Sequence, residues 1–326
     1  MTAIGANGWF GRARRAQSEM LLAVCFVVLI WVGYENVVGF TSSNSIKSIL
    51  LLSAFLGIAA LGQTLVSLAG GIDISIPFVV TFGDIVLAKL LAVGWSPEVA
   101  IALILVLAVL IGLLNGWLSW VLGVHPLLVT LGVGFAILGG AEIFFSNAQA
   151  TVPSWLTNLS SAGADTFGIG LPPVVFIWAV VAVLAIVGLR ASVVGRYLYA
   201  GGDNPIAADR MQARRKATWI GSFAISAAMA AVAGILLLGF GSAGNITVGE
   251  PYMLTTIAAV VVGGTTLLGG AGGYGRTVAG VLLLGVLNTL LVGLGVDPKL
   301  QQAVLGLIIL AMVSLYAREE HPRYRL

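Results

Sequence analysis

Charged side chains are scarce in this sequence: Lys, Arg, Asp and Glu together make up 9% of its 326 residues, against about 25% in soluble domains. Hydrophobic residues reach 59%, where about 45–50% is usual. So few charges could not cover so large an apolar interior, which excludes a soluble globular enzyme. The high hydrophobicity also excludes a disordered chain, because disorder needs low hydrophobicity and high net charge.

Side chains that carry covalent or metal chemistry are also few. Cys25 is the single cysteine, so no disulfide within the chain and no thiolate cluster can form. The two histidines, His125 and His321, are too far apart in sequence to suggest a metal site. None of the lysines follows a glycine, so the Gly-Lys-Ser/Thr motif of a phosphate-binding loop is missing. We therefore predict no catalytic residue, no metal and no cofactor in this chain, and any ATP hydrolysis must belong to a partner.

Glycine, by contrast, is abundant, with 43 residues, and it lies among long apolar runs. This combination is typical of transmembrane helices that pack closely through small residues. A porin-like barrel does not fit, because barrel strands alternate apolar and polar residues, whereas the run Val99 to Leu114 is apolar on every face. The glycine-dense run Gly263 to Gly273 is interpreted in the same way, as close helix packing.

About 20 residues are needed to cross the hydrocarbon core of a membrane, and the apolar segments divide the chain accordingly. Ten such segments are predicted, at 20–32, 46–69, 72–93, 98–122, 126–145, 172–190, 217–240, 253–270, 277–295 and 299–316. The predicted fold is an all-α polytopic membrane protein with about ten transmembrane helices. A transmembrane permease domain, 20–316, lies between an N-terminal tail, 1–19, and a C-terminal tail, 317–326.

The placement of basic residues predicts the orientation. With both termini in the cytoplasm, 13 of the 16 lysines and arginines fall on the cytoplasmic side, as the positive-inside rule requires. The segment 191–216 is then the long cytoplasmic connection, and 146–170 is an external loop. A similarity between residues 58–60 and 257–259, Ile-Ala-Ala in both, is attributed to chance because Ala and Gly are so common here.

The cytoplasmic segment 191–216 contains a helix-start signal. Asn204 is expected to cap a helix whose first residue is Pro205. The run Ile206 to Gln212 is only about two turns, too short to be stable alone in water. Three glycines before it are expected to allow tight turns: Gly195, Gly201 and Gly202. Two interpretations remain open, a coupling helix that receives force from a cytoplasmic partner and a solvated loop that only sets the topology.

Asp73 lies in the run Gly70 to Ser75. A charge at the centre of a membrane costs about 2.5–3.5 kcal/mol, so Asp73 is expected to face a cavity or a partner. The glycine pair at 70–71 favours a broken helix whose freed backbone groups line a pathway. The alternative is an interfacial turn in which Asp73 caps the next helix. Asp84 is nearer the middle of its predicted span, so the energetic cost of a charge within the membrane applies to it more clearly than to Asp73.

Polar residues within the spans are the candidates for a translocation path: Gln63, Asp73, Ser75, Asp84, Asn115, Thr130 and Asn288. Uncharged polar groups in membrane helices more often hold helices together, at about 0.6 kcal/mol per contact. A different class of function also remains open. In a secondary transporter driven by an ion gradient, Asp73, Asp84 and Glu142 would be the coupling acids.

Four signatures in order along the chain, the third of them in two parts, resemble the permease subunit of a ribose-type sugar importer of the ATP-binding-cassette (ABC) class, within the branched-chain amino acid and sugar permease superfamily. The motifs are Gly62-Gln63-Thr64-Leu65-Val66 with Gly70-Gly71-Ile72-Asp73-Ile74-Ser75, Asn115-Gly116 with Thr130-Leu131-Gly132, Gly195-Arg196-Tyr197-Leu198-Tyr199-Ala200-Gly201-Gly202, Asn204-Pro205 with Ala207-Ala208, and Ile257-Ala258-Ala259 with Gly263-Gly264. The resemblance covers roughly residues 48–316.

The resemblance implies a homodimer of the permease in the bacterial inner membrane, a cytoplasmic ABC ATPase that holds ATP and Mg, and an extracytoplasmic solute-binding protein. It implies no nucleic-acid partner, and the solute would be a sugar or sugar-like molecule. It also implies that the 195–212 loop contacts the ATPase. The residues carried over for this coupling are Gly195, Arg196, Tyr199, Gly201, Gly202, Asp203, Asn204, Pro205, Ala207 and Ala208.

The chain departs from the family pattern at three places. Pro77 and Phe78 stand where Gly-Ser is usual, and Met253 and Thr255 stand where two acids are usual. Gln212 occupies the position of a common glycine after the coupling segment. These departures bear on the identity of the solute and on the contacts with the binding protein rather than on the fold.

Overall fold

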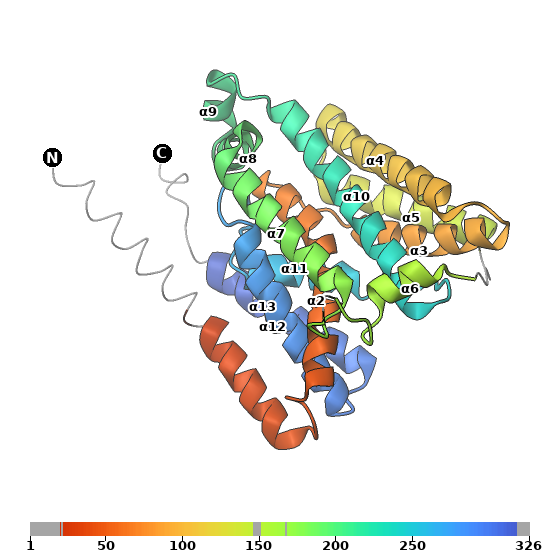
Figure 1. Ribbon diagram of the computed structural model, residues 1–326. Helices are drawn as coiled ribbons and strands as arrows, with labels where there is room; N and C mark the ends of the chain where they lie inside the picture. Colours follow the sequence, from red (N-terminus) through yellow and green to blue (C-terminus); the bar gives the residue numbers. More distant parts are fainter. Residues whose placement is uncertain (1–19, 21, 146–150, 167, 318–326) are drawn as a thin grey trace.

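The computed structural model describes residue 20 and residues 22–145, 151–166 and 168–317 (Figure 1). Within these ranges the chain is helical and contains no strand, which confirms the all-α prediction. Six helices are long and apolar enough to cross a membrane. They are α2 (Ser43–Leu68), α4 (Pro97–Leu122), α5 (Pro126–Phe145), α7 (Pro173–Ala191), α10 (Arg215–Gly241) and α12 (Tyr274–Gly293).

Four further helices coincide with the other predicted segments: Leu22–Asn36, α3 (Ile76–Ala92), α11 (Tyr252–Val262) and α13 (Pro298–Ala317). Three short helices lie in connections: α6 (Ser154–Ser160), α8 (Val193–Asp203) and α9 (Pro205–Arg210). The predicted tails 1–19 and 317–326 lie outside the described residues, except Ala317, which ends α13.

Two predicted spans have the wrong extent. The segment 72–93 becomes helical only at Ile76. The segment 253–270 stops at Val262, after an α11 of 11 residues. For 253–270 the reason is backbone geometry, because Gly264, Gly269 and Gly270 adopt φ angles of 85°, 92° and 73°, which a right-handed helix cannot contain.

Helices α2 and α10 form the centre of the molecule and are its most buried spans. They cross where Gly62 meets Ser226, and a Cβ at Gly62 would collide with the backbone of Ser226. Small residues permit such close crossings in membrane helices. The outer helices α4, α5 and α7 are buried over a minority of their length and carry exposed aliphatic side chains, as helices that face lipid do.

The order of elements repeats. A long helix, a break, a shorter helix and two further helices occur first in α2–α5 and again in α10–α13. Helix α10 packs against α4 as α2 packs against α12, and α3 packs against α5 as α11 packs against α13. Because α2 and α10 run in opposite directions (Figure 1), the two halves form an inverted repeat, a frequent feature of transporters. The sequence similarity of 58–60 to 257–259 pairs α2 with α11, which are not equivalent in this repeat.

Candidate functional site

The chain breaks its helical path between α2 and α3, and Asp73 lies at the centre of this break. The Asp73 side chain is 2% exposed. Its Oδ1 accepts hydrogen bonds from the backbone N of Ser75 at 2.9 Å and the hydroxyl of Ser75 at 2.5 Å. Its Oδ2 accepts a hydrogen bond from the hydroxyl of Ser226 on α10 at 2.7 Å. The carboxylate thus closes the break against the other central helix.

The break is deep. Ser226 follows Arg215, the first residue of α10, by 11 positions, which corresponds to about 16 Å along the helix axis. Trp219, one turn after Arg215, lies beside Gly71. The break therefore extends from about one turn inside α10, at Gly71, to about three turns inside it, at Asp73, and Asp73 also bonds the backbone of Ser75 just before α3.

Side chains from two other predicted path positions join this break. The Gln63 side-chain oxygen accepts a hydrogen bond from the backbone N of Asp73 at 3.3 Å. The Thr130 hydroxyl accepts one from the backbone N of Ile74 at 3.0 Å. Gln63 and Thr130 are completely buried. They satisfy backbone donors that the missing helical turn leaves free, as irregular backbone at membrane depth requires.

Asn115 completes the cluster from α4. Its Nδ2 donates to the Ser75 hydroxyl oxygen at 2.9 Å, while its Oδ1 is buried without a hydrogen-bond partner among the described residues. We call this group the Asp73 cluster; its members are Gln63, Asp73, Ser75, Asn115, Thr130 and Ser226. Five of the seven predicted path residues thus meet in one place, and their burial favours the interpretation that they hold helices together.

The other two predicted path residues lie elsewhere. Asp84 is buried, and its Oδ2 accepts a hydrogen bond from the backbone N of Asn245 at 2.6 Å. Asn245 belongs to 242–251, the break between α10 and α11 in the second repeat. Asn288 is exposed on α12. Within the described ranges, no three His, Cys, Asp or Glu side chains gather closely enough to hold a metal ion.

The predicted tight turns at Gly195, Gly201 and Gly202 are wrong. All three residues lie within α8, and none has a left-handed φ. Two of them serve close backbone approach instead. A Cβ at Gly195 would collide with the carbonyl oxygen of Leu189, and one at Gly202 would collide with the carbonyl oxygen of Leu68 at the end of α2.

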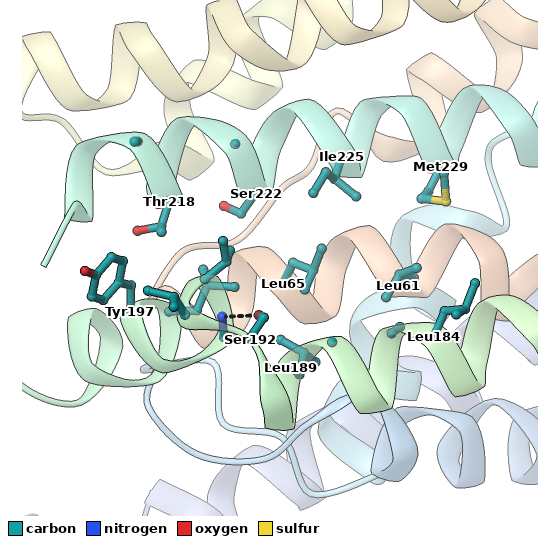
Figure 2. Close-up of a pocket in the computed structure, with 18 of the residues that line it drawn as sticks. Leu61, Leu65, Leu184, Leu189, Ser192, Tyr197, Thr218, Ser222, Ile225 and Met229 are labelled. Atoms are coloured by element: carbon teal, nitrogen blue, oxygen red, sulfur yellow. Dashed lines mark hydrogen bonds between the residues drawn. The ribbon is translucent and has the colours of Figure 1, made fainter.

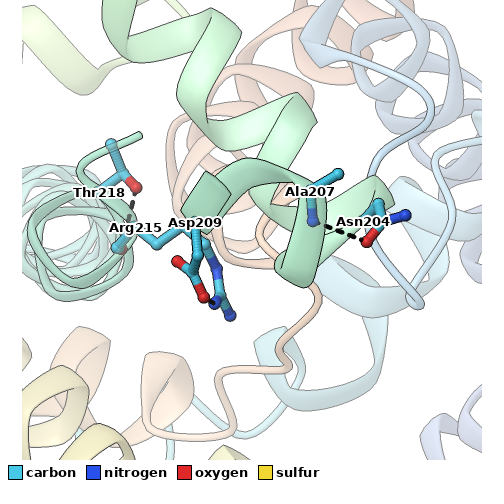
Figure 3. A network of polar contacts seen from close by, with 5 residues as sticks. All are labelled: Asn204, Ala207, Asp209, Arg215 and Thr218. Atoms are coloured by element: carbon cyan, nitrogen blue, oxygen red, sulfur yellow. Dashed lines mark hydrogen bonds and ion pairs between the residues drawn. The ribbon is translucent and has the colours of Figure 1, made fainter. Parts of the chain in front are cut away.

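The predicted helix start at Asn204 is confirmed. The Asn204 side-chain oxygen accepts a hydrogen bond from the backbone N of Ala207 at 3.1 Å, and Pro205 is the first residue of α9 (Figure 3). The helix ends at Arg210, two residues before its predicted end at Gln212. Gln212 has a φ of 55°, a left-handed value that explains why glycine is common at this position in the resembling family.

Helix α9 is attached to the start of α10. The Asp209 carboxylate pairs with the Arg215 guanidinium at 2.6 Å (Figure 3). The same guanidinium lies 5.4 Å from the ring centroid of Trp120 on α4, a cation–π distance. Arg215 therefore connects α9 with two membrane helices.

Helix α8 is attached to the glycine-rich loop between α11 and α12. The Tyr199 hydroxyl donates to the carbonyl oxygen of Gly272 at 3.0 Å. Burial raises the pKa of the Tyr199 phenol, while the charges of Arg190 and Arg276 lower it. The hydroxyl therefore keeps its proton at neutral pH and remains a donor.

The glycine-rich loop also contacts the end of α2. The backbone N of Gly270 donates to the carbonyl oxygen of Leu68 at 3.0 Å, and a Cβ at Gly269 would lie 2.9 Å from the Cα of Gly202. We call Leu68, Gly202, Gly269 and Gly270 the backbone junction. It connects α8, the glycine-rich loop and the last residue before the break, whereas the sequence pattern predicted only close helix packing for these glycines.

Two exposed apolar residues on α9 and at its end were not singled out from the sequence. Ile206 is 68% exposed and Met211 is 78% exposed. Of the ten predicted coupling residues, Arg196, Asp203, Asn204, Pro205 and Ala207 are also exposed, whereas Gly195 and Ala208 are buried. An apolar pair in an otherwise polar segment was the available signal, and a partner surface is what such a pair fits.

Comparisons with known proteins agree with these features. The family model described as "Branched-chain amino acid transport system / permease component" matches residues 45–313. The ribose import permease protein of Escherichia coli strain K12 is 31% identical, over 95% of this chain and 96% of its own length. A probable ABC transporter permease protein of Sinorhizobium fredii is 31% identical over 92% of this chain and 89% of its own length. The fructose import permease protein of Rhizobium meliloti is 29% identical over 91% of this chain and 85% of its own length. No solved structure matches.

Proposed function

The chain belongs to the family of permease components of branched-chain amino acid transport systems and is the permease subunit of an ABC importer, and we propose that it carries a sugar or a sugar-like solute. The observation that carries this proposal is the similarity, along nearly the whole chain, to permeases named for ribose and fructose import. The ATPase is a separate chain. A secondary transporter is not favoured, because similar proteins are named as permeases of ABC transporters.

We propose ten transmembrane helices with both termini in the cytoplasm. The helices that coincide with the ten predicted segments support this count, and the distribution of lysine and arginine supports the orientation. Helices α8 and α9 then lie on the cytoplasmic face and α6 on the external face. In a Cys25→Ser background, Asn158→Cys should react with an impermeant thiol reagent in intact cells and Ile206→Cys should not, and the reverse labelling would refute the orientation.

The ATPase is proposed to dock on α9, with Ile206 and Met211 as apolar anchors. A movement of α9 reaches α10 and α4 through Arg215. A movement of α8 reaches the end of α2 through the backbone junction. Because Leu68 ends α2 just before the break, the same movement reaches Asp73 and passes to α10 through the Ser226 hydrogen bond. Force from ATP binding is thereby delivered to the point where the two central helices meet.

Two copies of the chain are proposed to form the importer, with the solute path between them. Helix α5 supports this arrangement, since a Cβ at Gly132, Gly139 or Gly140 would meet nothing within 4 Å. A row of small residues lets another helix approach closely. The Asp73 cluster would then lie behind the path and control the positions of its walls.

Reconstitution tests the assignment. The permease is placed in proteoliposomes with its ATPase and its solute-binding protein, and ATP hydrolysis and uptake are measured with ribose, fructose or a branched-chain amino acid. A sugar should stimulate both activities through the binding protein, and an amino acid should not. Stimulation by the amino acid alone would refute the sugar assignment. Uptake that survives an inactive ATPase and collapses with the ion gradient would refute the importer.

A further inference from the structure

A groove of about 940 Å³ lies between α7, α8 and α10, with α2 as its floor (Figure 2). Its surface is mainly apolar. The floor is formed by Leu61 and Leu65, and the walls by Leu184 and Leu189 on one side and Ile225 and Met229 on the other. Nothing in the proposed transport cycle uses this groove.

The groove opens toward the bilayer. Leu184 on α7 is 66% exposed and Ile225 on α10 is 45% exposed, so both walls face the surroundings of the helices. Along α10 the groove extends from Thr218 to Met229, 11 residues or about 16 Å. The hydrocarbon core is about 30 Å thick, so the groove has about the depth of one leaflet.

Polar groups line the half of the groove near α8, where Ser222 lies one turn along α10 from Thr218. Thr218, Ser192 and Tyr197 bring hydroxyl groups to the end near α8 (Figure 2). Arg214 lines the same end, and among the described residues no hydrogen bond or ion pair holds its guanidinium. A guanidinium is well suited to bidentate contact with a phosphate. An apolar channel with a cation at its mouth has the charge pattern of a phospholipid site.

We propose that this groove binds an acyl chain of an anionic phospholipid, whose phosphate lies at Arg214. The chain lies along Leu61 and Leu65, and the headgroup lies beside α8. This site is independent of the transported solute and of the proposed function. Only the identity of the leaflet, the cytoplasmic one, rests on the proposed orientation.

Two glycines give a way to fill the groove without disturbing the fold. Gly188 on α7 and Gly221 on α10 both line it, and a Cβ at either would meet nothing within 4 Å. Leucine at these positions therefore occupies the space of the acyl chain and collides with no protein atom at Cβ. Gly241 on the same helix α10 is equally open and lies outside the groove, so Gly241→Leu is the matched control.

The experiment uses the permease in nanodiscs of phosphatidylcholine that contain a small fraction of phosphatidylglycerol with a photoreactive acyl chain. Crosslinked residues are identified by mass spectrometry. Labelling should concentrate on Leu184, Ile225 and Met229 over the equally apolar, exposed Val106 and Leu110 of α4. Gly221→Leu and, as a second variant, Gly188→Leu should abolish the excess of groove labelling over α4 labelling. Gly241→Leu should leave this excess unchanged.

The headgroup is tested by moving the photoreactive chain to phosphatidylcholine. Wild-type labelling in the groove should be weaker with this zwitterionic lipid. Arg214→Gln should reduce the preference for phosphatidylglycerol by about five-fold, the effect of one cation near an anionic headgroup, about 1 kcal/mol. Lys216→Gln, which removes an exposed cation outside the groove lining, should change it little.

Three outcomes would overturn the proposal. The first is equal labelling of the groove and of α4. The second is equal labelling of the wild-type groove by phosphatidylglycerol and phosphatidylcholine. The third is excess labelling that Gly188→Leu and Gly221→Leu both leave unchanged, because the acyl chain would then not lie in the groove.

Discussion

The two breaks of the inverted repeat occupy equivalent positions but are held in different ways. At 69–75, the Asp73 carboxylate accepts hydrogen bonds from three donors, and buried side chains from α2, α4, α5 and α10 surround it. At 242–251, Asp84 accepts one backbone donor, Asn245, and the Thr81 hydroxyl accepts another, Gly249. The first break also adjoins α8 through the backbone junction.

The difference indicates a division of roles. The first break is a rigid joint that receives movement from the cytoplasmic helices, since nearly every donor in it has a partner within the protein. The second is held by fewer bonds to neighbouring helices and has several exposed residues, so it can rearrange at a lower cost in free energy. We therefore expect the first break to transmit the movement of the cytoplasmic helices to α10, and the second break to change its conformation in response.

The largest effect is expected at Asp73. Asp73→Ala leaves the Ser75 backbone N, the Ser75 hydroxyl and the Ser226 hydroxyl without their acceptor. Each such buried donor costs about 1–3 kcal/mol, so the stability should fall by about 3 kcal/mol or more. Asp84→Ala removes one backbone acceptor and should cost about 1 kcal/mol. Thermal denaturation of the two purified variants measures the difference, and equal losses would contradict the contrast between the breaks.

Gly202→Ala should have the next largest effect. Its Cβ meets backbone atoms of Leu68 and Gly270, which cannot move aside as a flexible side chain could, and such overpacking costs about 1–3 kcal/mol. We expect transport and binding-protein-stimulated ATP hydrolysis to fall together in proteoliposomes, while the basal activity of the ATPase persists.

Gly201→Ala is the matched control for that experiment. Gly201 precedes Gly202 in the same helix, and its Cβ would lie 3.4 Å from the flexible Arg215 side chain. This variant should transport nearly as well as the wild type. If both substitutions are tolerated, the backbone junction does not connect α8 to the first break.

A smaller effect is expected at Asn204. Asn204→Ala removes the side-chain acceptor at the start of α9, worth about 1 kcal/mol. Helix α9 has six residues and little stability of its own. The fraction of molecules in which a formed α9 is docked on the ATPase should fall. Stimulated ATP hydrolysis should therefore weaken, without a change in the thermal midpoint of the membrane domain. Asn204→Ser, which keeps a capping oxygen, should restore the stimulation.

The smallest expected effect is a gain in stability, at Gln212. Gln212 has a left-handed φ, which costs a non-glycine residue about 1–2 kcal/mol. Gln212→Gly should therefore stabilise the turn after α9 by up to about 1 kcal/mol, once the greater flexibility of glycine in the unfolded chain is counted. Hydrogen exchange of the backbone amides in α9 should slow in this variant. Faster exchange would show that the left-handed geometry is not strained here.

The sequence by itself determined the features that depend on composition or on neighbouring residues. Apolar runs predicted helices throughout, and Asn204 with Pro205 predicted the start of α9. A helix cap is a contact between residues three positions apart, so its pattern is local and can be recognised without coordinates. The same reasoning singled out Asp73 as unusual, because a buried charge is costly wherever it is placed.

Only the tertiary structure decided which polar residues act together. Ser226 bonds Asp73 across 153 residues of sequence, and nothing near Ser226 in the chain distinguishes it from the other serines. The glycines of α8 were assigned to turns because their conformational freedom is a local property, whereas Gly202 is required by the approach of Leu68 from another helix. Contacts between distant segments depend on the packing of all the helices around α2 and α10, and the linear pattern contains no record of that packing.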